Sequence, residues 1–490
     1  MAHRVRTGPQ RSLDEHARYA ELAPAVEALR NDARPVADAL RGRTVWTVNS
    51  TAQGGGVSEM LPGIIALLNE LGIATEWIVI DPTDPAFFPL TKRVHNLIHG
   101  EGTPDLGERE RTVFEETNRA NADELRSWIR DGDILIAHDP QPMPLAGMLL
   151  DHLRITCVWR CHIGLDERND ATRAGWGFLR PYATHYAHAI FSAPEYVPSF
   201  FEGRASIIYP GLDPLSEKNR PLDDVGAVLE RAGLLRSRAS RAEPPFANLV
   251  QRLQPDGGFG AGTEPDDLGL LSRPIVTQVS RWDRLKGFLP LLHGFALLKS
   301  QLRHDPPAAD DLRRRLQHVR LVLAGPEPES VADDPQGRGV LEELRAAWLA
   351  LPDPIRDDSA LLALPMHDAA LNGRIVNALQ RASTIVVQNS LREGFGLTIT
   401  EAMWKARPVL SNSQACGPRQ QVRGGVDGEL ISDPQNVGAI AAALARMLAE
   451  PAKLEQWGRN AQRRVLDHFL VYTQLRHWLR LFRTVPLAGA

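Results

Sequence analysis

Short apolar runs recur along the chain, and most are followed by a glycine or polar turn and then by an amphipathic stretch. Runs of this length that are rich in β-branched residues predict buried strands, whereas the amphipathic stretches predict helices. Because strands that alternate with helices form parallel sheets, the pattern predicts an α/β fold. The expected strands are residues 44–48, 76–80, 133–137, 156–160, 275–279, 321–325 and 384–387.

Length and a shift in composition divide the chain into two domains. At 490 residues the chain is too long for one ordinary core. Between residues 221 and 273 it becomes rich in Gly, Pro, Ser and Arg, which is typical of a linker or surface insertion. The expected segments are a helical extension at 1–40, a first domain at 41–220, the linker at 221–273, a second domain at 274–465 and a terminal helix at 466–490.

Composition excludes several classes of protein. Apolar residues make up 43% and charged residues 24% of the chain, as in a globular enzyme, and the net charge of -4 gives no reason to expect nucleic acid as a partner. No apolar run reaches membrane-spanning length, and the polar residues 1–22 do not resemble a signal peptide. The three cysteines cannot form a disulfide framework and suit a reducing compartment, so we expect a cytoplasmic protein.

A metal site is not predicted. Cys157, Cys161 and His162 lie close together in the sequence, but their spacing fits no standard zinc pattern. Burial in or beside a strand is the simpler explanation for the two thiols.

The most informative stretch follows the expected strand at 384–387. Gly394 and Gly396 flank Phe395, so the backbone can turn tightly before a helix that begins at about Leu397. The first amides of a helix, at the positive end of its dipole, suit a phosphate.

Two carboxylates flank this turn. Glu393 lies in the loop and Glu401 lies eight positions later, about one turn inside the helix. They are therefore far enough apart to bind the two ends of a nucleotide sugar, Glu393 the sugar hydroxyls and Glu401 the ribose diol. The alternative is a carboxylate at a helix N-terminus and an unrelated surface glutamate.

Cations follow the first strand of the second domain. Arg281 and Lys286 lie in the pattern Ser-Arg-x-Asp-x-x-Lys-Gly, where two positive charges could neutralise a departing diphosphate. The alternative is a basic pair on the surface. Gly325, at the end of the strand at 321–325, is expected to lie against the base or the diphosphate.

The first domain has its own loops at strand ends. Gly55 and Gly56 end a glycine-rich loop between the strand at 44–48 and a helix, and we expect either close approach to a diphosphate or sugar, or a plain tight turn. The strands at 133–137 and 156–160 end in His138-Asp139-Pro140 and Cys161-His162. Polar residues at the carboxyl ends of parallel strands lie where such sheets bind ligands.

These motifs resemble a known family. The Glu-x7-Glu stretch and the Ser-Arg-x-Asp-x-x-Lys-Gly pattern resemble the retaining glycosyltransferases of family 4, which have the GT-B fold: two Rossmann-like domains that face a central cleft. A closer resemblance, to the trehalose glycosyltransferring synthases, is carried by residues 138–142, 159–163, 193–197 and 213–219.

The resemblance implies roles for individual residues. His162 would lie beside the transferred sugar, and Asp139 and Arg160 would line the glucose cleft. Arg281 and Lys286 would hold the leaving phosphate. The terminal helix at 466–490 would cross back onto the first domain, although a plain surface helix explains its apolar spacing equally well.

The resemblance also implies an activity. The chain would be a retaining glucosyltransferase that makes trehalose, reversibly, from a nucleoside diphosphate glucose (ADP-, UDP- or GDP-glucose) and free glucose. It would need no obligatory cofactor, with Mg2+ and a homodimer left open. The alternatives are a retaining trehalose phosphorylase, a family 4 enzyme with another acceptor, and a non-catalytic nucleotide-sugar sensor.

One segment departs from the family pattern. Where these enzymes have a Gly-Gly turn after the residues that correspond to Pro408-Val409-Leu410, this chain has Gln414-Ala415-Cys416-Gly417-Pro418-Arg419-Gln420. The departure leaves the local backbone conformation open. It also leaves open whether Arg419 contacts a ligand or faces water.

Overall fold

The computed structural model divides into two compact units. It describes residues 2–52, 56–82, 84–236, 249–264, 267–327 and 335–488. One unit comprises Met1–Gly211 with Phe469–Ala490, and the other comprises Leu212–His468. Within the described ranges, no helix is both long enough and apolar enough to cross a bilayer.

The first unit is built on a seven-stranded sheet of order β1-β3-β2-β4-β5-β6-β7. All neighbouring strands are parallel except β1, which pairs antiparallel with β3. β2, β4 and β5 are buried along their whole length, as expected for apolar strands covered on both faces. The strands are β1 His3–Val5, β2 Val45–Asn49, β3 Thr75–Val79, β4 Ile134–His138, β5 Thr156–Arg160, β6 His188–Phe191 and β7 Ala205–Ile207.

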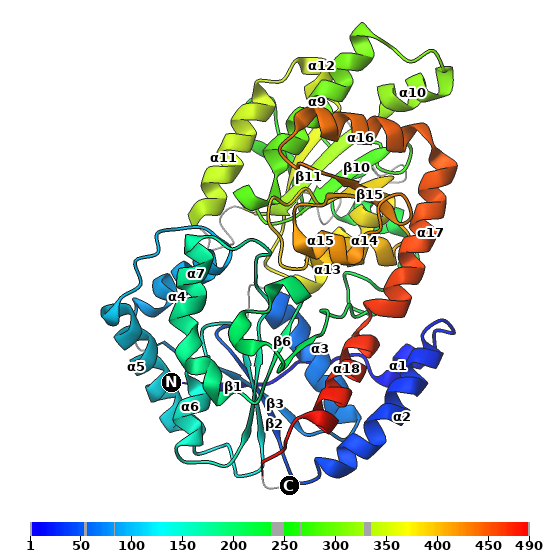
Figure 1. Cartoon of the computed structure of the whole chain (residues 1–490). Helices are drawn as coiled ribbons and strands as arrows, with labels where there is room; N and C mark the ends of the chain where they lie inside the picture. Colours follow the sequence, from blue (N-terminus) through cyan, green and yellow to red (C-terminus); the bar gives the residue numbers. More distant parts are fainter. Residues whose placement is uncertain are drawn as a thin grey trace. The chain divides into compact units, whose positions relative to one another are not determined.

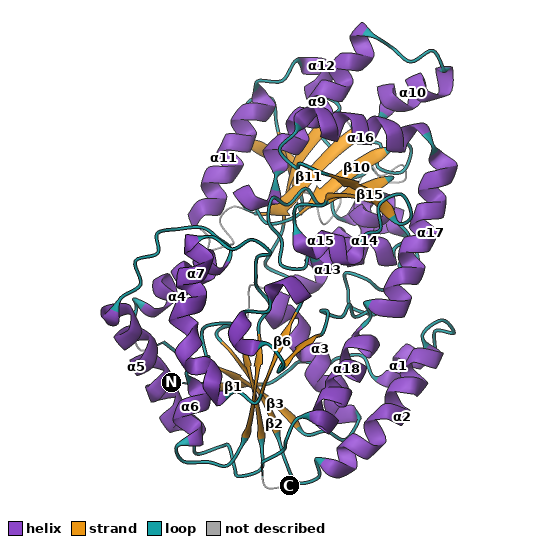
Figure 2. Cartoon of the chain, in the orientation of Figure 1, coloured by secondary structure: helices purple, strands orange, loops and turns teal. Residues whose placement is uncertain are grey.

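Helices cover both faces of this sheet. In Figure 2 the sheet is seen nearly edge-on, with α4 to α7 on one side and α3 and α18 on the other. The helices are α1 Leu13–Ala17, α2 Ala23–Ala39, α3 Gly56–Glu70, α4 Phe87–Ile98, α5 Glu108–Leu125, α6 Leu145–Leu150, α7 Asp170–Leu179 and α18 Val471–Thr484, with 3-10 turns η1 Arg180–His185, η2 Pro194–Tyr196 and η3 Ser199–Phe201.

The last helix belongs to the first unit although it is last in the sequence. α18 lies beside α1 and α2 (Figure 1). Arg476 Nε donates to Asp32 Oδ2 at 2.6 Å, and the backbone N of Gly211 donates to Gln474 Oε1 at 2.9 Å. The buried apolar face of α18 therefore packs against helices from the N-terminal part of the chain.

The second unit is built on an eight-stranded sheet of order β15-β14-β13-β10-β11-β12-β8-β9. The strands from β15 to β12 are parallel, whereas β8 and β9 are antiparallel at one edge. They are β8 Gln251–Leu253, β9 Phe259–Ala261, β10 Ile275–Val279, β11 Arg320–Pro326, β12 Ser359–Leu364, β13 Ile385–Val387, β14 Val409–Asn412 and β15 Gly428–Ile431.

Side chains alternate between two cores on the faces of this sheet. Val276 packs in a core with α9 and α16, whereas the neighbouring Ile275 packs in a core with α8 and α13. The helices are α8 Val225–Arg231, α9 Phe288–His304, α10 Asp310–His318, α11 Pro335–Leu349, α12 Asp353–Arg356, α13 Ala369–Ala382, α14 Leu397–Trp404, α15 Cys416–Gln421, α16 Val437–Ala449 and α17 Pro451–His468, with the 3-10 turn η4 Arg284–Lys286.

Two segments differ from expectation. Where described, residues 221–273 are not a linker, because α8 packs in the core of the second unit and β8 and β9 extend its sheet. Their polar and glycine-rich sequence concealed strands that lie at an edge, where little apolar surface is needed. Residues 1–40 are not wholly helical either, since His3–Val5 add an edge strand to the first sheet.

Candidate active site

The Glu-x7-Glu stretch forms a tight loop between β13 and α14. Gly396 precedes the helix with φ 86°, a left-handed conformation that favours glycine. Phe395 between the two glycines is buried, with 6% of its surface exposed, so it anchors the loop to the unit. Leu397 is the first residue of α14, as the sequence predicts.

Glu393 in this loop forms an ion pair with Lys286, which ends the 3-10 turn η4 after β10. Lys286 Nζ lies 2.6 Å from Glu393 Oε2, and both side chains are largely buried, 17% and 12% exposed. The same oxygen accepts from Ser390 Oγ at 2.9 Å and from Gln388 Nε2 at 3.3 Å. The structure therefore joins a residue expected at the phosphate with one expected at the sugar.

The buried side-chain amide of Gln278 fixes the backbone around Lys286 through two hydrogen bonds. Gln278 Nε2, at the end of β10, donates to the carbonyl of Lys286 at 2.7 Å, and its Oε1 accepts from the backbone N of Asn389 at 3.0 Å. Gly287 follows with φ 63°, and a Cβ there would lie 2.2 Å from the carbonyl oxygen of Asn389. The ends of β10 and β13 are thus held together at the position of the ion pair.

Arg281 and Gly325, which the sequence also places near the nucleotide, lie in surroundings that differ from those of Lys286. Arg281 is exposed, directly after β10. A Cβ at Gly325 would lie 2.4 Å from the ring of Trp282, whose Nε1 donates to the carbonyl of Pro326 at 2.7 Å. Packing alone explains the glycine, and its contact with a donor stays a prediction.

Glu401 lies on α14 and is 7% exposed. Gln380 Nε2, on α13, lies 3.5 Å from Glu401 Oε2, and Lys405 Nζ donates to the backbone carbonyl of Glu401 at 3.0 Å. A nearly buried carboxylate with few donors is the arrangement expected if hydroxyl groups complete its hydrogen bonds. This burial argues against an unrelated surface glutamate.

The segment that departs from the family pattern packs on the loop. α15 begins at Cys416, and the backbone N of Gly417 donates to the carbonyl of Glu393 at 3.3 Å. A Cβ at Gly417 would lie 2.4 Å from the carbonyl oxygen of Phe395. Arg419 NH1 donates to the carbonyls of Ser413 at 2.7 Å and Gln414 at 3.2 Å, so this cation stabilises the turn.

In the first unit the candidate residues gather at the ends of β4 and β5. Asp139 has φ 63°, an uncommon conformation for a residue other than glycine. Its Oδ1 accepts from the backbone N of His162 at 2.7 Å, and its own backbone N donates to the carbonyl of Arg160 at 2.8 Å. Strained backbone at a strand end, held by hydrogen bonds from both sides, is typical of a functional site.

The two histidines of this group are stacked. Nδ1 of His138 lies 3.0 Å from Nε2 of His162, and the rings are 5.3 Å apart at an interplanar angle of 11°. Burial, and next the Arg160 charge, lower the pKa of His138 to about 3 and that of His162 well below its usual value. Both imidazoles are therefore neutral near pH 7, which suits hydrogen bonding to a hydroxyl group better than proton donation.

Arg160 and Asp139 carry charges of opposite sign, and Asp139 is half-buried. The Arg160 side chain is fully buried; its NH1 donates to the carbonyl of Phe191 at 3.2 Å, whereas Nε and NH2 have no partner among the described atoms. Burial raises the pKa of Asp139 to about 6, opposed by the His162 amide and the Arg160 charge. Buried N–H donors of this kind are suited to hydrogen bonds with hydroxyl groups.

Other expectations fall elsewhere. Gly55 lies outside the described residues, and Gly56 is the exposed first residue of α3. Cys157, Cys161 and Cys416 are buried free thiols. Among the residues that the structure describes, no group of three or more His, Cys, Asp and Glu side chains is arranged to hold a metal ion.

Sequence reasoning missed several residues that support the site. Ser390 and Gln388 bind Glu393, and Lys405 and Gln380 contact Glu401. Only Lys405 carried a signal, since it lies four positions after Glu401 and so on the same face of the helix. The others lie on loops or on another helix, and their contacts follow from the folded arrangement.

Similarity to known proteins runs over both units. A family model described as "Trehalose synthase, N-terminal domain" matches residues 47–198, and one described as "Glycosyl transferases group 1" matches residues 370–464. The chain is 32% identical to the trehalose synthase of Pyrococcus horikoshii over 456 residues, which cover 92% of each chain. It is 26% identical to the trehalose phosphorylase of Pleurotus sajor-caju, covering 91% of this chain but 58% of that protein.

Solved structures share the fold. An alpha,alpha-trehalose-phosphate synthase (UDP-forming) from Burkholderia xenovorans matches with a TM-score of 0.62 and 16% identity, covering 90% of this chain and 100% of that one. At this level of identity the match concerns the fold alone. It confirms the α/β GT-B fold expected from the sequence.

Proposed function

Because the chain belongs to the trehalose synthase family of group 1 glycosyltransferases, we propose that it transfers glucose from a nucleoside diphosphate to free glucose and so forms trehalose. The observation that carries the proposal is the Lys286–Glu393 ion pair of 2.6 Å, in the loop that leads to Glu401. This pair supports the proposal because it brings a cation and a carboxylate together in front of a helix N-terminus, a combination suited to a phosphate and a sugar.

The second unit would bind the donor. Glu393 accepts hydrogen bonds from the hydroxyls of the transferred glucose, and Glu401 accepts them from the ribose. The amides at the start of α14, near Gly394, Phe395 and Gly396, lie against the diphosphate, and Lys286 and Arg281 neutralise it. Preorganised positive charge favours the transition state, because negative charge grows on the phosphate oxygen as the bond to the sugar breaks.

The chemical step would retain the anomeric configuration. The acceptor hydroxyl attacks C1 of the glucose from the face that the phosphate leaves. As the bond between C1 and the phosphate oxygen breaks and the new glycosidic bond forms, the acceptor proton passes to that phosphate oxygen. The products are trehalose and the nucleoside diphosphate, and no side chain becomes covalently bonded to the sugar.

The first unit would bind the sugars. His162, neutral at pH 7, hydrogen bonds a hydroxyl of the transferred glucose, and Asp139 and Arg160 hold glucose hydroxyls through their opposite charges. The Arg160 donors without partners support this role, because a polyol would satisfy them. The route uses side chains of the chain itself, and dependence on Mg2+ is tested by adding a chelator.

The cytoplasmic location stays a prediction from the sequence, which leaves the donor base and a homodimer open. The phosphorylase alternative is weaker, because the match to the Pleurotus protein is less identical and covers little more than half of that protein. An enzyme with another acceptor would keep the donor residues and differ around Asp139 and Arg160.

Product analysis with purified protein tests the proposal. ADP-, UDP- and GDP-glucose are each incubated with glucose, and we expect a non-reducing disaccharide that trehalase cleaves, with an equal amount of nucleoside diphosphate. Formation of glucose 1-phosphate from trehalose and phosphate, with no product from any nucleotide, would instead establish a phosphorylase. Inactivity in both assays would point to another acceptor.

A further inference from the structure

Lys405 is a buried cation that the proposed reaction does not use. It lies directly after α14 and is 4% exposed. Its Nζ donates to the backbone carbonyl of Glu401 and to Asn219 Oδ1, both at 3.0 Å. It therefore joins the backbone of Glu401, the residue expected at the ribose, to a segment far away in the sequence.

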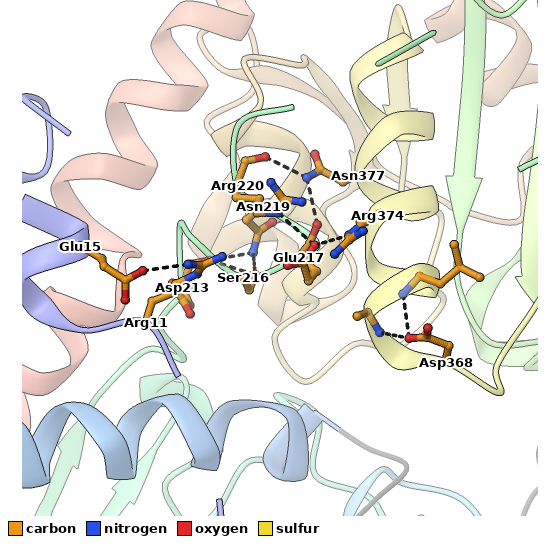
Figure 3. A network of polar contacts seen from close by, with 12 residues as sticks. Arg11, Glu15, Asp213, Ser216, Glu217, Asn219, Arg220, Asp368, Arg374 and Asn377 are labelled. Atoms are coloured by element: carbon orange, nitrogen blue, oxygen red, sulfur yellow. Dashed lines mark hydrogen bonds and ion pairs between the residues drawn. The ribbon is translucent and has the colours of Figure 1, made fainter. Parts of the chain in front are cut away.

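Asn219 belongs to residues 213–220, the segment that begins the second unit. This segment folds on itself, because Asn219 Nδ2 donates to the carbonyl of Asp213 at 3.0 Å and to Ser216 Oγ at 2.9 Å (Figure 3). The side chain is thereby oriented with its oxygen toward Lys405. The amide nitrogen of Asn219 thus faces two acceptors, and its oxygen faces the Lys405 ammonium, which can only donate.

The same segment is fastened to α13. Asn377 Nδ2 donates to the carbonyls of Glu217 at 3.0 Å and Arg220 at 2.9 Å, and Arg374 Nε pairs with Glu217 Oε2 at 2.6 Å (Figure 3). α13 also supplies Gln380, which lies beside the Glu401 carboxylate. Segment 213–220, α13 and α14 thus form one polar network around Glu401.

The position is costly for a lysine. Burial lowers the pKa of Lys405 to about 7, and the nearby charges are Glu401 on its own helix, which raises the pKa, and Arg381 on α13 and Lys218 in the segment, which lower it. A methionine would fill the same space without that cost. A buried ammonium beside other cations therefore favours a function that needs its hydrogen bonds.

We propose that Lys405 is a positioning residue that, with Asn219, holds Glu401 in the orientation that binds the ribose of the donor. This inference rests on the proposed function, since it takes Glu401 as the ribose-binding group. Lys405 itself does not touch the donor. It acts by fixing the backbone of the helical turn that carries the Glu401 side chain.

Discrimination between ribose and deoxyribose tests the inference. The dissociation constants of a nucleoside diphosphate and of its 2′-deoxy and 3′-deoxy forms are measured by calorimetry on the intact protein. In the unmodified protein we expect the deoxy forms to bind about 10-fold to 100-fold more weakly, because a hydrogen bond to a charged group is lost. In Lys405→Met this ratio should fall toward 1, with the weakening confined to the ribose form.

Lys299→Met is the matched control. Lys299 is also buried, 5% exposed, in the second unit, and its Nζ donates to the carbonyls of Leu316 at 2.9 Å and Gln317 at 2.8 Å. It lacks contact with Glu401, so the ratio should stay at the value of the unmodified protein even if stability falls. Asn219→Ala provides a second variant should Lys405→Met fail to fold, and it should lower the ratio as well.

The outcomes separate the inference from the proposed function. If Glu401→Gln lowers the ratio but Lys405→Met and Asn219→Ala do not, Glu401 binds the ribose and the positioning role is wrong. If Glu401→Gln leaves the ratio unchanged, the ribose assignment itself fails. An equal fall in Lys299→Met would show that any buried lysine has the same general effect, and this too would overturn the inference.

Discussion

At the scale of single residues, Asp139 combines two unfavourable features. Its backbone is left-handed, with φ 63°, and burial raises the pKa of its carboxyl group to about 6 from a usual value of 3.8. A folded-state pKa above the unfolded one means that the ionised form destabilises the protein, and this cost develops as the pH rises from about 4 to 6. Such a residue is retained for function when the neutral form would be more stable.

Replacing Asp139 with Asn should therefore separate stability from activity. Asn tolerates the left-handed region and can accept the same hydrogen bond from His162, but it has no charge. Above pH 6 we expect the variant to be more stable by roughly 2–3 kcal/mol at most, measured by denaturant unfolding.

In the same variant, kcat/KM for glucose should no longer fall as the pH is lowered through 6. For the unmodified protein we expect kcat/KM for glucose to rise with pH through an apparent pKa near 6, since this parameter reports the enzyme form to which glucose binds. Asp139→Asn should be much less active and should show a flat profile through that range. A limb that persists in the variant would assign the titration to another group.

Lys286 offers a second test at this scale. Lys286→Met removes the cation that lies 2.6 Å from Glu393 and would hold the leaving phosphate. We expect kcat to fall by about 100-fold to 1,000-fold, the loss typical of one preorganised charge-stabilising group. Single-turnover kinetics with saturating donor measures the chemical step directly.

Arg284→Met is the control for this charge. Arg284 lies in the same 3-10 turn, is exposed and pairs with Glu343. An exposed ion pair of this kind contributes little to stability. We therefore expect kcat to change by less than about twofold and the free energy of unfolding by less than about 1 kcal/mol. A comparable loss of kcat in both variants would mean that the turn, and not the Lys286 charge, is what matters.

At the scale of elements, several strands inside the sheets could be predicted, whereas the edge strands and some interior strands, such as β6 and β12, were missed. The run at 156–160 is β5, and that at 275–279 is β10, because continuous apolar runs are needed where both faces are covered. The edge strands β1 and β9 lack such runs. Edge strands bury less surface, so their sequences carry little signal.

The parts of the site that depend on local sequence could also be predicted, whereas contacts between distant residues could not. The glycine turn at Gly396 and the helix that begins at Leu397 follow from local sequence, and so does the position of Glu401 within it. The ion pair between Lys286 and Glu393 joins residues 107 positions apart, on loops that follow different strands. Which side chains meet at the carboxyl ends of the strands depends on the order of the strands in the sheet. The periodicity of apolar residues does not specify that order.

The contact of α15 with the donor loop gives a prediction at this scale. In Gly417→Ala the new Cβ would lie 2.4 Å from the carbonyl oxygen of Phe395, so the loop that holds Glu393 must shift. We expect KM for the nucleotide sugar to rise about tenfold or more, because displacements of about 1 Å at a site are costly. Initial rates at varied donor concentration measure this effect.

Gly424→Ala is the matched control for the loop. Its nearest neighbour would be Leu430 Cβ at 4.0 Å, an ordinary contact, so KM should stay unchanged. If Gly417→Ala also leaves KM unchanged, α15 does not support the donor loop, and the departure from the Gly-Gly turn has no bearing on donor binding.

At the scale of the whole molecule, the chain folds as two units whose boundaries do not follow sequence order. The first unit includes Phe469–Ala490, so its last helix forms only after the entire second unit has been synthesised. α18 buries Leu475 and Leu479 almost completely, so its apolar face is part of the core of that unit. The stability of the first unit therefore depends on residues far from the rest of its sequence.

Calorimetry should resolve the two units. A nucleoside diphosphate at 100 times its dissociation constant should stabilise the second unit by about 2.7 kcal/mol, because the proposed donor residues Lys286, Glu393 and Glu401 all lie there. Leu475→Ala should instead destabilise the first unit by about 2–5 kcal/mol through the cavity that it leaves, whereas Arg480→Ala, on the exposed side of the same helix, should have little effect. We therefore expect two thermal transitions, one raised by the nucleotide and the other lowered by Leu475→Ala. A single transition that responds to both changes would mean that the two units unfold cooperatively, and the nucleotide would then protect the first unit as well.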